Sequence, residues 1–523
     1  HAKDRRLQLA TLEGPTLERL ASLLPPSADQ GMPVYVRGDA EAQHFSTAAR
    51  LCLEDPGVDA LLAILTPHAL TDPDAFARQL IETAADHRKP LFTCWMGGDA
   101  VAESRTLFSA NKIPTYATPE AAVDAIAALN LFAENQVQLL QVPEPLAASS
   151  APDREAAQLV IDAALEAGQE WLNPAQSKAV LAAFNIPIVR SLPARSAADA
   201  VTVAQEVGFP VAMKILSPDI AHKTDVGGVR LGIENAREVR EAYESMLAGV
   251  AQARPDAALE GVLIEPMYRE RNGREVMIGV VRDPVFGPAI SFGLGGTLVE
   301  VIRDRAVALP PLNRFLAHEL MRRTRAWQAL QPLRGAPAAD AEALEETLLR
   351  VSEVVCELPD IGAMDLNPVI VTDTGAIVVD ARIAVQRGSA TALPYAHMAI
   401  HPYPSKLIQT LELPGGLTAT LRPIRPEDAA IETAFVNGLS EQSRFLRFMF
   451  GLHSLTPAML SRFTQIDYDR ELALIAVIDT PQGEQQIGVA RYITLPDEET
   501  CEFAIVVGDE WQGKGLAKQL FAM

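Results

Sequence analysis

The sequence lacks the features that mark a membrane protein, a disulfide-stabilised fold or a general nucleic-acid binder. Its 523 residues include only four cysteines, which are far apart and form no CxxC pair. Neither a disulfide scaffold nor a zinc site is therefore expected, and a reducing, cytoplasmic compartment fits. No run approaches the roughly 18 consecutive apolar residues of a membrane helix. The net charge of −22 argues against the basic surface that nucleic-acid phosphates require.

The chain is too long for one hydrophobic core, and at roughly 100–200 residues per domain it predicts about three to four domains. Its first part, residues 26–145, alternates short apolar runs with helical stretches. Such alternation predicts a parallel, doubly wound α/β sheet, in which ligands bind at the carboxyl ends of the strands. The predicted strands are Pro33–Val36, Ala60–Leu65, Pro90–Trp95 and Pro114–Tyr116, and the helices include Ala75–Asp86 and Pro119–Phe132.

The C-terminal region contains a strand, a turn and a helix start that together suit a pyrophosphate. The apolar strand Cys501–Val507 runs into a turn with Gly513 and Gly515, and a helix with apolar spacing follows. Glycine lets phosphates approach the backbone, and a helix start offers N–H groups and a positive dipole end. The alternative is an ordinary helix start after a strand. The candidate acyl-CoA-binding residues are Val506, Val507, Gln512, Gly513, Lys514, Gly515, Leu516 and Ala517.

The pattern of Gln512–Ala517 behind an acid-led strand resembles motif A of the GNAT acetyltransferases, whose loop holds the CoA pyrophosphate. Leu421–Asp428 resembles the first GNAT strand and the start of its first helix, and Ser440–Phe448 and Phe463–Glu471 resemble segments of the large bacterial Pat-type protein lysine acetyltransferases. The resemblance places the family's glutamate at Glu502. A carboxylate there would act as general base, because a protonated lysine amine cannot attack a thioester. The alternative is a solvated glutamate at a strand end.

The middle of the chain contains residue types suited to a nucleotide and a divalent cation. Lys214 lies in the apolar run Phe209–Ile220, where a lysine on a strand can place a point charge against phosphates. The glycine-rich stretch Phe292–Thr297 is a loop that phosphates can approach. Asp365 and Asn367 are two residues apart and would share one strand face, where an acid and an amide oxygen suit Mg²⁺. Taken alone, the Asp-x-Asn-Pro sequence is more typical of a turn.

In this order, these features resemble the ATP-grasp domain of the ADP-forming acyl-CoA synthetases, over about residues 160–386. His222 matches a histidine of that family that accepts or relays a phosphoryl group as a nucleophile; the alternative is a buried histidine bonded to backbone. The resemblance also implies that the backbone near residues 265–267 meets adenine. The implied ATP-binding residues are Lys214, Glu265, Met267, Gly293, Gly295 and Gly296, and the implied metal ligands are Glu275, Asp365 and Asn367.

Residues 26–145 resemble the flavodoxin-like ligase subdomain of the same synthetases, through Pro33–Ala40 and Thr66–Pro73. The predicted fold class is therefore α/β multidomain, with a flavodoxin-like parallel sheet, an α+β ATP-grasp domain and a partial GNAT domain. The first residue is not Met and the last falls within the motif A helix, so we expect a fragment truncated at both ends. The predicted segments are the end of a preceding synthetase subdomain (1–25), the succinyl-CoA-ligase-type subdomain (26–145), a linker (146–159), the ATP-grasp domain (160–390), a second linker (391–416) and an incomplete GNAT domain (417–523).

Three functions fit these features. The leading prediction is transfer of acetyl from acetyl-CoA to lysines of metabolic enzymes, such as an acetyl-CoA synthetase, under control of an ATP-binding synthetase-like region. The first alternative is an active ADP-forming acetate or acyl-CoA synthetase that works through a phosphohistidine, and the second is a nucleotide or acyl-CoA sensor without turnover. The expected ligands are acetyl-CoA, ATP or ADP, and Mg²⁺. The expected partners are a protein with a target lysine and further copies of the chain, with neither nucleic acid nor membrane.

Overall fold

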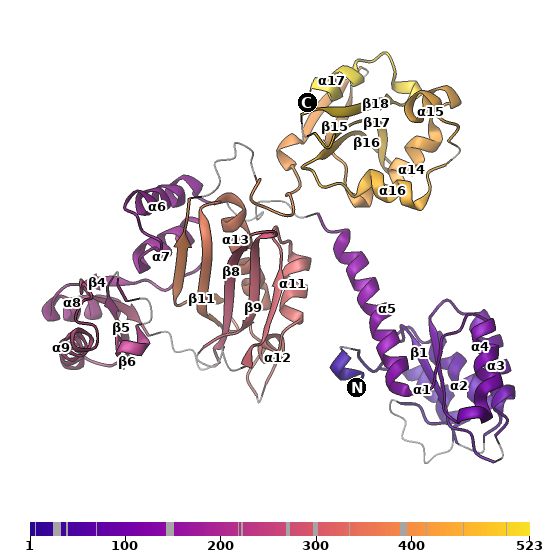
Figure 1. Cartoon of the computed structure of the whole chain (residues 1–523), viewed down its shortest axis with the longest axis horizontal. Coiled ribbons are helices and arrows are strands. Elements are labelled where there is room, and N and C mark those ends of the chain that lie inside the picture. The colour runs from indigo at the N-terminus through magenta and orange to yellow at the C-terminus, as the bar shows by residue number, and fades with distance from the viewer. Residues whose placement is uncertain are drawn as a thin grey trace. The chain divides into compact units, whose positions relative to one another are not determined.

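The structure is a computed structural model of the whole chain, and it divides into two compact units, His1–Leu139 and Leu140–Met523. Figure 1 labels the helices and strands of both units. The structure describes all residues except 6, 25–32, 38–39, 70, 143–150, 218, 221–222, 268–271, 297–301, 334, 388–394, 415, 453, 498 and 523.

The first unit contains a parallel sheet with helices packed around it. Its strands β1 (Leu61–Leu65), β2 (Leu91–Trp95) and β3 (Thr115–Tyr116) are hydrogen-bonded in that order. Asp72 begins the helix α3, because its Oδ1 accepts hydrogen bonds from the backbone N–H groups of Asp74 and Ala75. The helices are α1 (Gly14–Leu23), α2 (Ala42–Glu54), α3 (Pro73–Ala85), α4 (Ala102–Ala110) and α5 (Pro119–Leu139).

One of the four predicted strands does not form. Residues 33–36 have no sheet partner among the described residues. Val34 and Val36 instead pack against a cluster of buried side chains that includes Leu12, Leu20 and Leu51. Burial alone therefore accounts for the apolar pattern, whereas a strand also requires a neighbour that completes its backbone hydrogen bonds.

The second unit begins with the helices α6 (Arg154–Glu166) and α7 (Pro174–Ala183). An antiparallel sheet follows, which we call the small sheet, with strands in the order β4, β7, β5 and β6. The helices α8 (Ala197–Val207) and α9 (Ala236–Ala253) pack against it, around a core that includes Val211, Ile215 and Ile264. Its strands are β4 (Leu192–Ala194), β5 (Val211–Leu216), β6 (Val229–Ile233) and β7 (Gly261–Pro266).

A second sheet, which we call the large sheet, has the order β10-β9-β8-β11-β12, and β13 also pairs with β11. Its apolar side chains share one core with those of the helices α6, α7, α11 and α13. Its strands are β8 (Arg274–Asp283), β9 (Gly287–Leu294), β10 (Arg305–Ala308), β11 (Ile361–Val371), β12 (Ala376–Val378) and β13 (Ala381–Val385). The helices here are α11 (Arg314–Arg322), α12 (Ala326–Leu330) and α13 (Ala341–Glu357).

The C-terminal region contains an antiparallel five-stranded sheet that is buried on both faces. Alternate residues of β16 fall into two separate apolar clusters, with Leu474 and Ala476 in one and Ile475 and Val477 in the other, as the two-residue period of a strand requires. The strands are β14 (Gln409–Leu413), β15 (Leu417–Pro423), β16 (Glu471–Thr480), β17 (Gly483–Thr494) and β18 (Cys501–Val507), in that order. The helices are α14 (Ala429–Gly438), α15 (Glu441–Phe448), α16 (Pro457–Thr464) and α17 (Leu516–Ala522).

The predicted fold class is confirmed: the chain is a mixed α/β protein with several sheets, one of them parallel. The four cysteines are free, as their spacing predicts. Among the described residues no helix is both long and apolar enough to cross a membrane. The six segment boundaries stay predictions.

Candidate active site

Lys214 lies where the small sheet meets the large sheet. It is the only charged residue of β5, whose first five residues are buried. Its Nζ lies 2.9 Å from Glu265 Oε2 on β7 and 3.3 Å from Asp380 Oδ1, which precedes β13 of the large sheet. A buried charge is costly unless it is paired, and the two carboxylates supply that pairing for the ammonium group of Lys214.

Glu265 also contacts a second lysine, which comes from α7. Its Oε1 lies 2.8 Å from the Nζ of Lys178, and the hydroxyl of Ser191 donates to the same oxygen. Lys178 is one of the buried residues of α7. We call Lys178, Lys214, Glu265 and Asp380 the lysine–carboxylate cluster. The sequence patterns indicate roles for Lys214 and Glu265 but none for Lys178 or Asp380.

The pKa values in this cluster follow its charges. Burial alone would lower the pKa of Lys214, but Asp380 and Glu265 outweigh it and raise that pKa. Burial likewise opposes ionisation of Glu265, but Lys214 and Lys178 lower its pKa. Burial lowers the pKa of Lys223, which lies within electrostatic reach of Asp380 and Lys214. Three lysines thus face two carboxylates, a positive excess that suits an anionic ligand.

The predicted glycine-rich loop lies beside two of the predicted metal ligands. The backbone N–H of Gly295 donates to the carbonyl oxygen of Glu275 at 3.0 Å, and that of Gly296 donates to Asn367 Oδ1 at 2.9 Å. Gly296 has φ of +80°, and a Cβ there would lie 2.2 Å from Glu275 Oε2. The backbone angle favours glycine at this position, and an added Cβ would displace the Glu275 carboxylate.

A model of the ATP-grasp domain family matches residues 163–385. Over 230 residues the chain is 40% identical to the beta subunit of ADP-forming acetate–CoA ligase II of Pyrococcus furiosus, a match that covers 43% of this chain and 97% of that subunit. The chain belongs to the family of ADP-forming acyl-CoA synthetases. The chain is also similar to the ADP-forming acetate–CoA ligase I of Archaeoglobus fulgidus, with 36% identity over 377 residues. That match covers 72% of this chain but 53% of the relative, so the chain spans about half the length of the relative.

A solved structure of acetyl-CoA synthetase 1 from Ca. Korarchaeum cryptofilum contains CoA and Mg-AMPPCP. It is 34% identical, covers 44% of this chain and all of that chain, and has a TM-score of 0.39. The prediction of acetyl-CoA and of ATP or ADP as ligands agrees with the ATP-grasp match and with relatives that are named as ADP-forming acetate–CoA ligases.

The leading prediction of a protein lysine acetyltransferase is wrong, because the relatives that cover most of this chain are ADP-forming ligases. The C-terminal region is 34% identical over 104 residues to an acetyltransferase of Pseudomonas aeruginosa, a match to 20% of this chain and 56% of that protein. The similarity to an acetyltransferase thus covers one fifth of the chain, whereas the similarity to the ligases covers 72%.

The oxygen donors near the glycine-rich loop fit a hard cation. Asp365 on β11 is exposed as a whole residue, but partial desolvation of its carboxyl group raises the pKa of that group. Within the described residues, no group of three or more His, Cys, Asp or Glu side chains could hold a metal ion alone. Mg²⁺ commonly takes one or two carboxylates and completes its shell with phosphate oxygens and water. The structure places Glu275 and Asn367 beside the glycine-rich loop, whereas Asp365 pairs with Gly279, four residues along β8 from Glu275. The three stay predicted ligands for Mg²⁺ that arrives with a nucleotide.

Most of the groups predicted to contact adenine already have partners within the protein. The side chain of Glu265 is held by lysines, Pro266 has no N–H group, and the N–H of Met267 donates to Pro210 O at 2.9 Å. Base recognition by Met267 therefore stays a prediction that rests on its carbonyl group. His222 lies outside the described residues.

The predicted acyl-CoA loop follows β18 in the C-terminal region. Gly513 and Gly515 have φ of +75° and +83°, and a Cβ at either would meet nothing within 4 Å. The ammonium of Lys514 lies 4.4 Å from the ring centre of Trp511, and Gln512 Nε2 donates to Val507 O at 3.3 Å. Val507 and Leu516 are buried, and the side chains of Glu502 and Ala517 are exposed.

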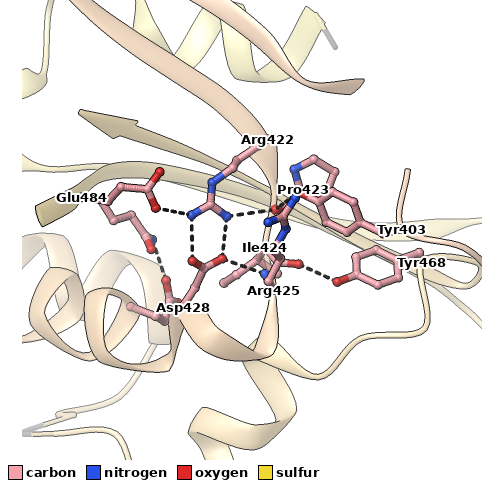
Figure 2. Close-up of polar contacts among 10 residues, drawn as sticks. Tyr403, Arg422, Pro423, Ile424, Arg425, Asp428, Tyr468 and Glu484 are labelled. Atoms are coloured by element: carbon pink, nitrogen blue, oxygen red, sulfur yellow. Dashed lines mark hydrogen bonds and ion pairs between the residues drawn. The ribbon is translucent and has the colours of Figure 1, made fainter. Parts of the chain in front are cut away.

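In the same C-terminal region, a buried arginine links β15 to the segment that precedes α14. Arg422 donates to both oxygens of Asp428 at 2.7 Å, and to Glu484 Oε2 at 2.7 Å. Figure 2 shows these contacts together with the hydroxyls of Tyr403 and Tyr468, which donate to the carbonyl groups of residues 423 and 424. The segment that resembles a GNAT strand and helix start is thus held in place by side-chain contacts.

The substitution Gly296→Ala is expected to lower nucleotide affinity by about tenfold or more, because strain at such a position costs about 1–3 kcal/mol and the methyl would displace Glu275. Gly249→Ala is the matched control, because a Cβ at Gly249 on α9 meets nothing within 4 Å. Titration calorimetry with ADP checks both variants. Equal affinity of Gly296→Ala and Gly249→Ala for ADP would show that the loop does not touch the nucleotide.

Proposed function

We propose that this chain provides the nucleotide site of an ADP-forming acyl-CoA synthetase, where a phosphoryl group moves between ATP and the acyl-activating chemistry. The observation that carries the proposal is Lys214, an ammonium group held between Glu265 and Asp380 at the junction of two sheets. The match to the ATP-grasp family over residues 163–385 supports the same assignment.

The residues of the chain suggest how each part of the nucleotide is held. Lys214 attracts the phosphates, as does Lys223, because both ammonium groups lie in a region of excess positive charge. The N–H groups of Gly295 and Gly296 bond to Glu275 O and Asn367 Oδ1, so the loop would hold these two predicted metal ligands beside the phosphate chain. Such groups catalyse phosphoryl transfer by position and charge rather than by covalent chemistry.

Glu275, Asp365 and Asn367 would hold Mg²⁺, which when bound neutralises the phosphate oxygens and orients them for transfer. In the direction of ADP formation, the bond between the γ-phosphorus and its bridging oxygen breaks and a bond to the acceptor forms. The predicted acceptor in this chain is His222, whose neighbour Lys223 faces the lysine–carboxylate cluster.

The C-terminal region is proposed as an acyl-CoA-recognising domain joined to the synthetase. Its similarity to an acetyltransferase and the two open glycines, Gly513 and Gly515, support recognition of CoA. Two relatives are named as subunits, so we also propose that this synthetase works in an assembly with further chains.

Titration calorimetry of the chain tests the proposal. ADP and ATP are expected to bind, and more tightly with Mg²⁺ than with EDTA, because the cation offsets phosphate charge. Adenosine is expected to bind more weakly than ADP, because it offers nothing to Lys214. The whole protein that contains the chain should form ADP from ATP when acetate and CoA are both present. The absence of any nucleotide binding at millimolar concentration would refute the proposal.

A further inference from the structure

Lys178 differs from the other cations of the site because its ammonium group is fully occupied by the protein. Its Nζ donates to Glu265 Oε1 and to Val189 O, both at 2.8 Å, and also to the hydroxyl of Ser191. An ammonium group has three N–H donors, so these contacts use all of them. Lys178 is 9% exposed, and it therefore has no donor left for a ligand.

Glu265 connects this occupied lysine to Lys214. One carboxylate oxygen faces Lys178 and the other lies 2.9 Å from Lys214. Since Lys214 also contacts Asp380, two carboxylates would outweigh its single positive charge if Lys178 were absent. Lys178 supplies the opposing charge for Glu265, and Lys214 thereby keeps a positive potential for phosphates.

The two lysines come from different parts of the fold. The apolar side chains of α7, Val180 and Leu181, belong to the core of the large sheet, whereas Glu265 lies on β7 of the small sheet. The Lys178–Glu265 contact therefore holds Oε1 of the carboxylate, while Lys214 contacts Oε2. Ser191, between α7 and β4, adds a third contact that restricts the rotation of Glu265.

We propose that Lys178 is a positioning residue for nucleotide phosphates: it holds and neutralises Glu265, so that Lys214 presents its charge to the ligand. The inference rests on the proposed function, because it concerns the same nucleotide site. Lys178 acts through Glu265 and touches no ligand atom.

The test compares Lys178→Met, Glu265→Gln and the double variant by titration calorimetry with ADP and with adenosine. Lys178→Met is expected to weaken ADP binding about tenfold or more, because the whole charge of Glu265 then falls on Lys214. The double variant removes both charges and should bind ADP within about threefold of the wild type. Adenosine affinity should not change in any variant, because it carries no phosphate. Lys112→Met, at an exposed position of the first unit, is the control.

Each outcome decides the matter. ADP affinity that is unchanged in Lys178→Met, or that stays weak in the double variant, would overturn the inference. An equal loss for adenosine and ADP would also overturn it, because it would indicate a general distortion. If Lys178→Met does not fold, the double variant carries the test alone, since it leaves no unpaired buried charge. A wild-type chain that binds no ADP refutes the proposed function instead.

Discussion

Replacing Lys214 with methionine is expected to lower the affinity of the chain for ADP and ATP by about 100-fold or more, because a fixed charge aimed at phosphates in a buried site is worth that much. Lys214 is 8% exposed and lies between the carboxylates of Glu265 and Asp380. Without its ammonium group, the two carboxylates repel the phosphates that they now help to position.

The methionine side chain keeps the apolar length of lysine in a strand whose neighbours Met213 and Ile215 are fully buried. The fold is expected to survive, because Glu265 retains its contact with Lys178 and Asp380 is 30% exposed. Calorimetry with ADP measures the effect, and thermal unfolding of the same samples verifies the fold. Lys112→Met, which removes an equal charge far along the chain, should bind ADP as the wild type does. Near-normal affinity in Lys214→Met would remove Lys214 from the nucleotide site.

Local patterns in the sequence predict the strand that bears Lys214 but not the partners of this residue. A buried run of Val, Ala, Met, Ile and Leu with one lysine gives β5, Val211–Leu216, as the pattern indicates. Asp380 follows Lys214 by 166 residues and Glu265 follows Lys178 by 87. Contacts at such separations depend on how the two sheets pack, which no local pattern reports.

Lys178, the second lysine that contacts Glu265, could not be recognised from the sequence. In the sequence it looks like a surface lysine of an ordinary helix, since most lysines are exposed. Its burial becomes visible only when α7 packs on the large sheet and Val189, Ser191 and Glu265 close around it. A signal was present in one respect: α7 is apolar on most sides, and a helix of that kind is expected to be buried.

The prediction of activity failed for a related reason. Gln512–Ala517 is a recognisable local motif. Its two glycines have positive φ, and an added Cβ at either would meet no other atom within 4 Å. The motif nevertheless describes one loop, whereas the identity to ADP-forming ligases extends over 72% of the chain. The order of Lys214, the glycine-rich loop and Asp365 along the chain carried more information about function than the short motif Gln512–Ala517.

The largest expected effect on stability comes from Arg422→Met in the C-terminal domain. Burial alone would lower the pKa of Arg422, but Asp428 and Glu484 outweigh it and raise that pKa. The guanidinium is 9% exposed and Asp428 is 7% exposed, and Figure 2 shows the contacts between the two groups. Removing one partner of such a buried pair leaves an uncompensated charge and costs about 3–5 kcal/mol.

Hydrogen exchange measured by mass spectrometry can locate this loss within a chain of several domains, for which one unfolding temperature is not a defined quantity. Peptides from β15 and β16 should exchange faster in Arg422→Met, while peptides from β8 of the large sheet remain unchanged. Glu484→Gln is the matched control, because Glu484 is 45% exposed and such contacts are worth about 0–1 kcal/mol. Wild-type exchange of β15 in Arg422→Met would mean that the domain does not depend on the Arg422–Asp428 pair. Faster exchange there, together with unchanged ADP affinity, would show that the C-terminal domain unfolds independently of the nucleotide site.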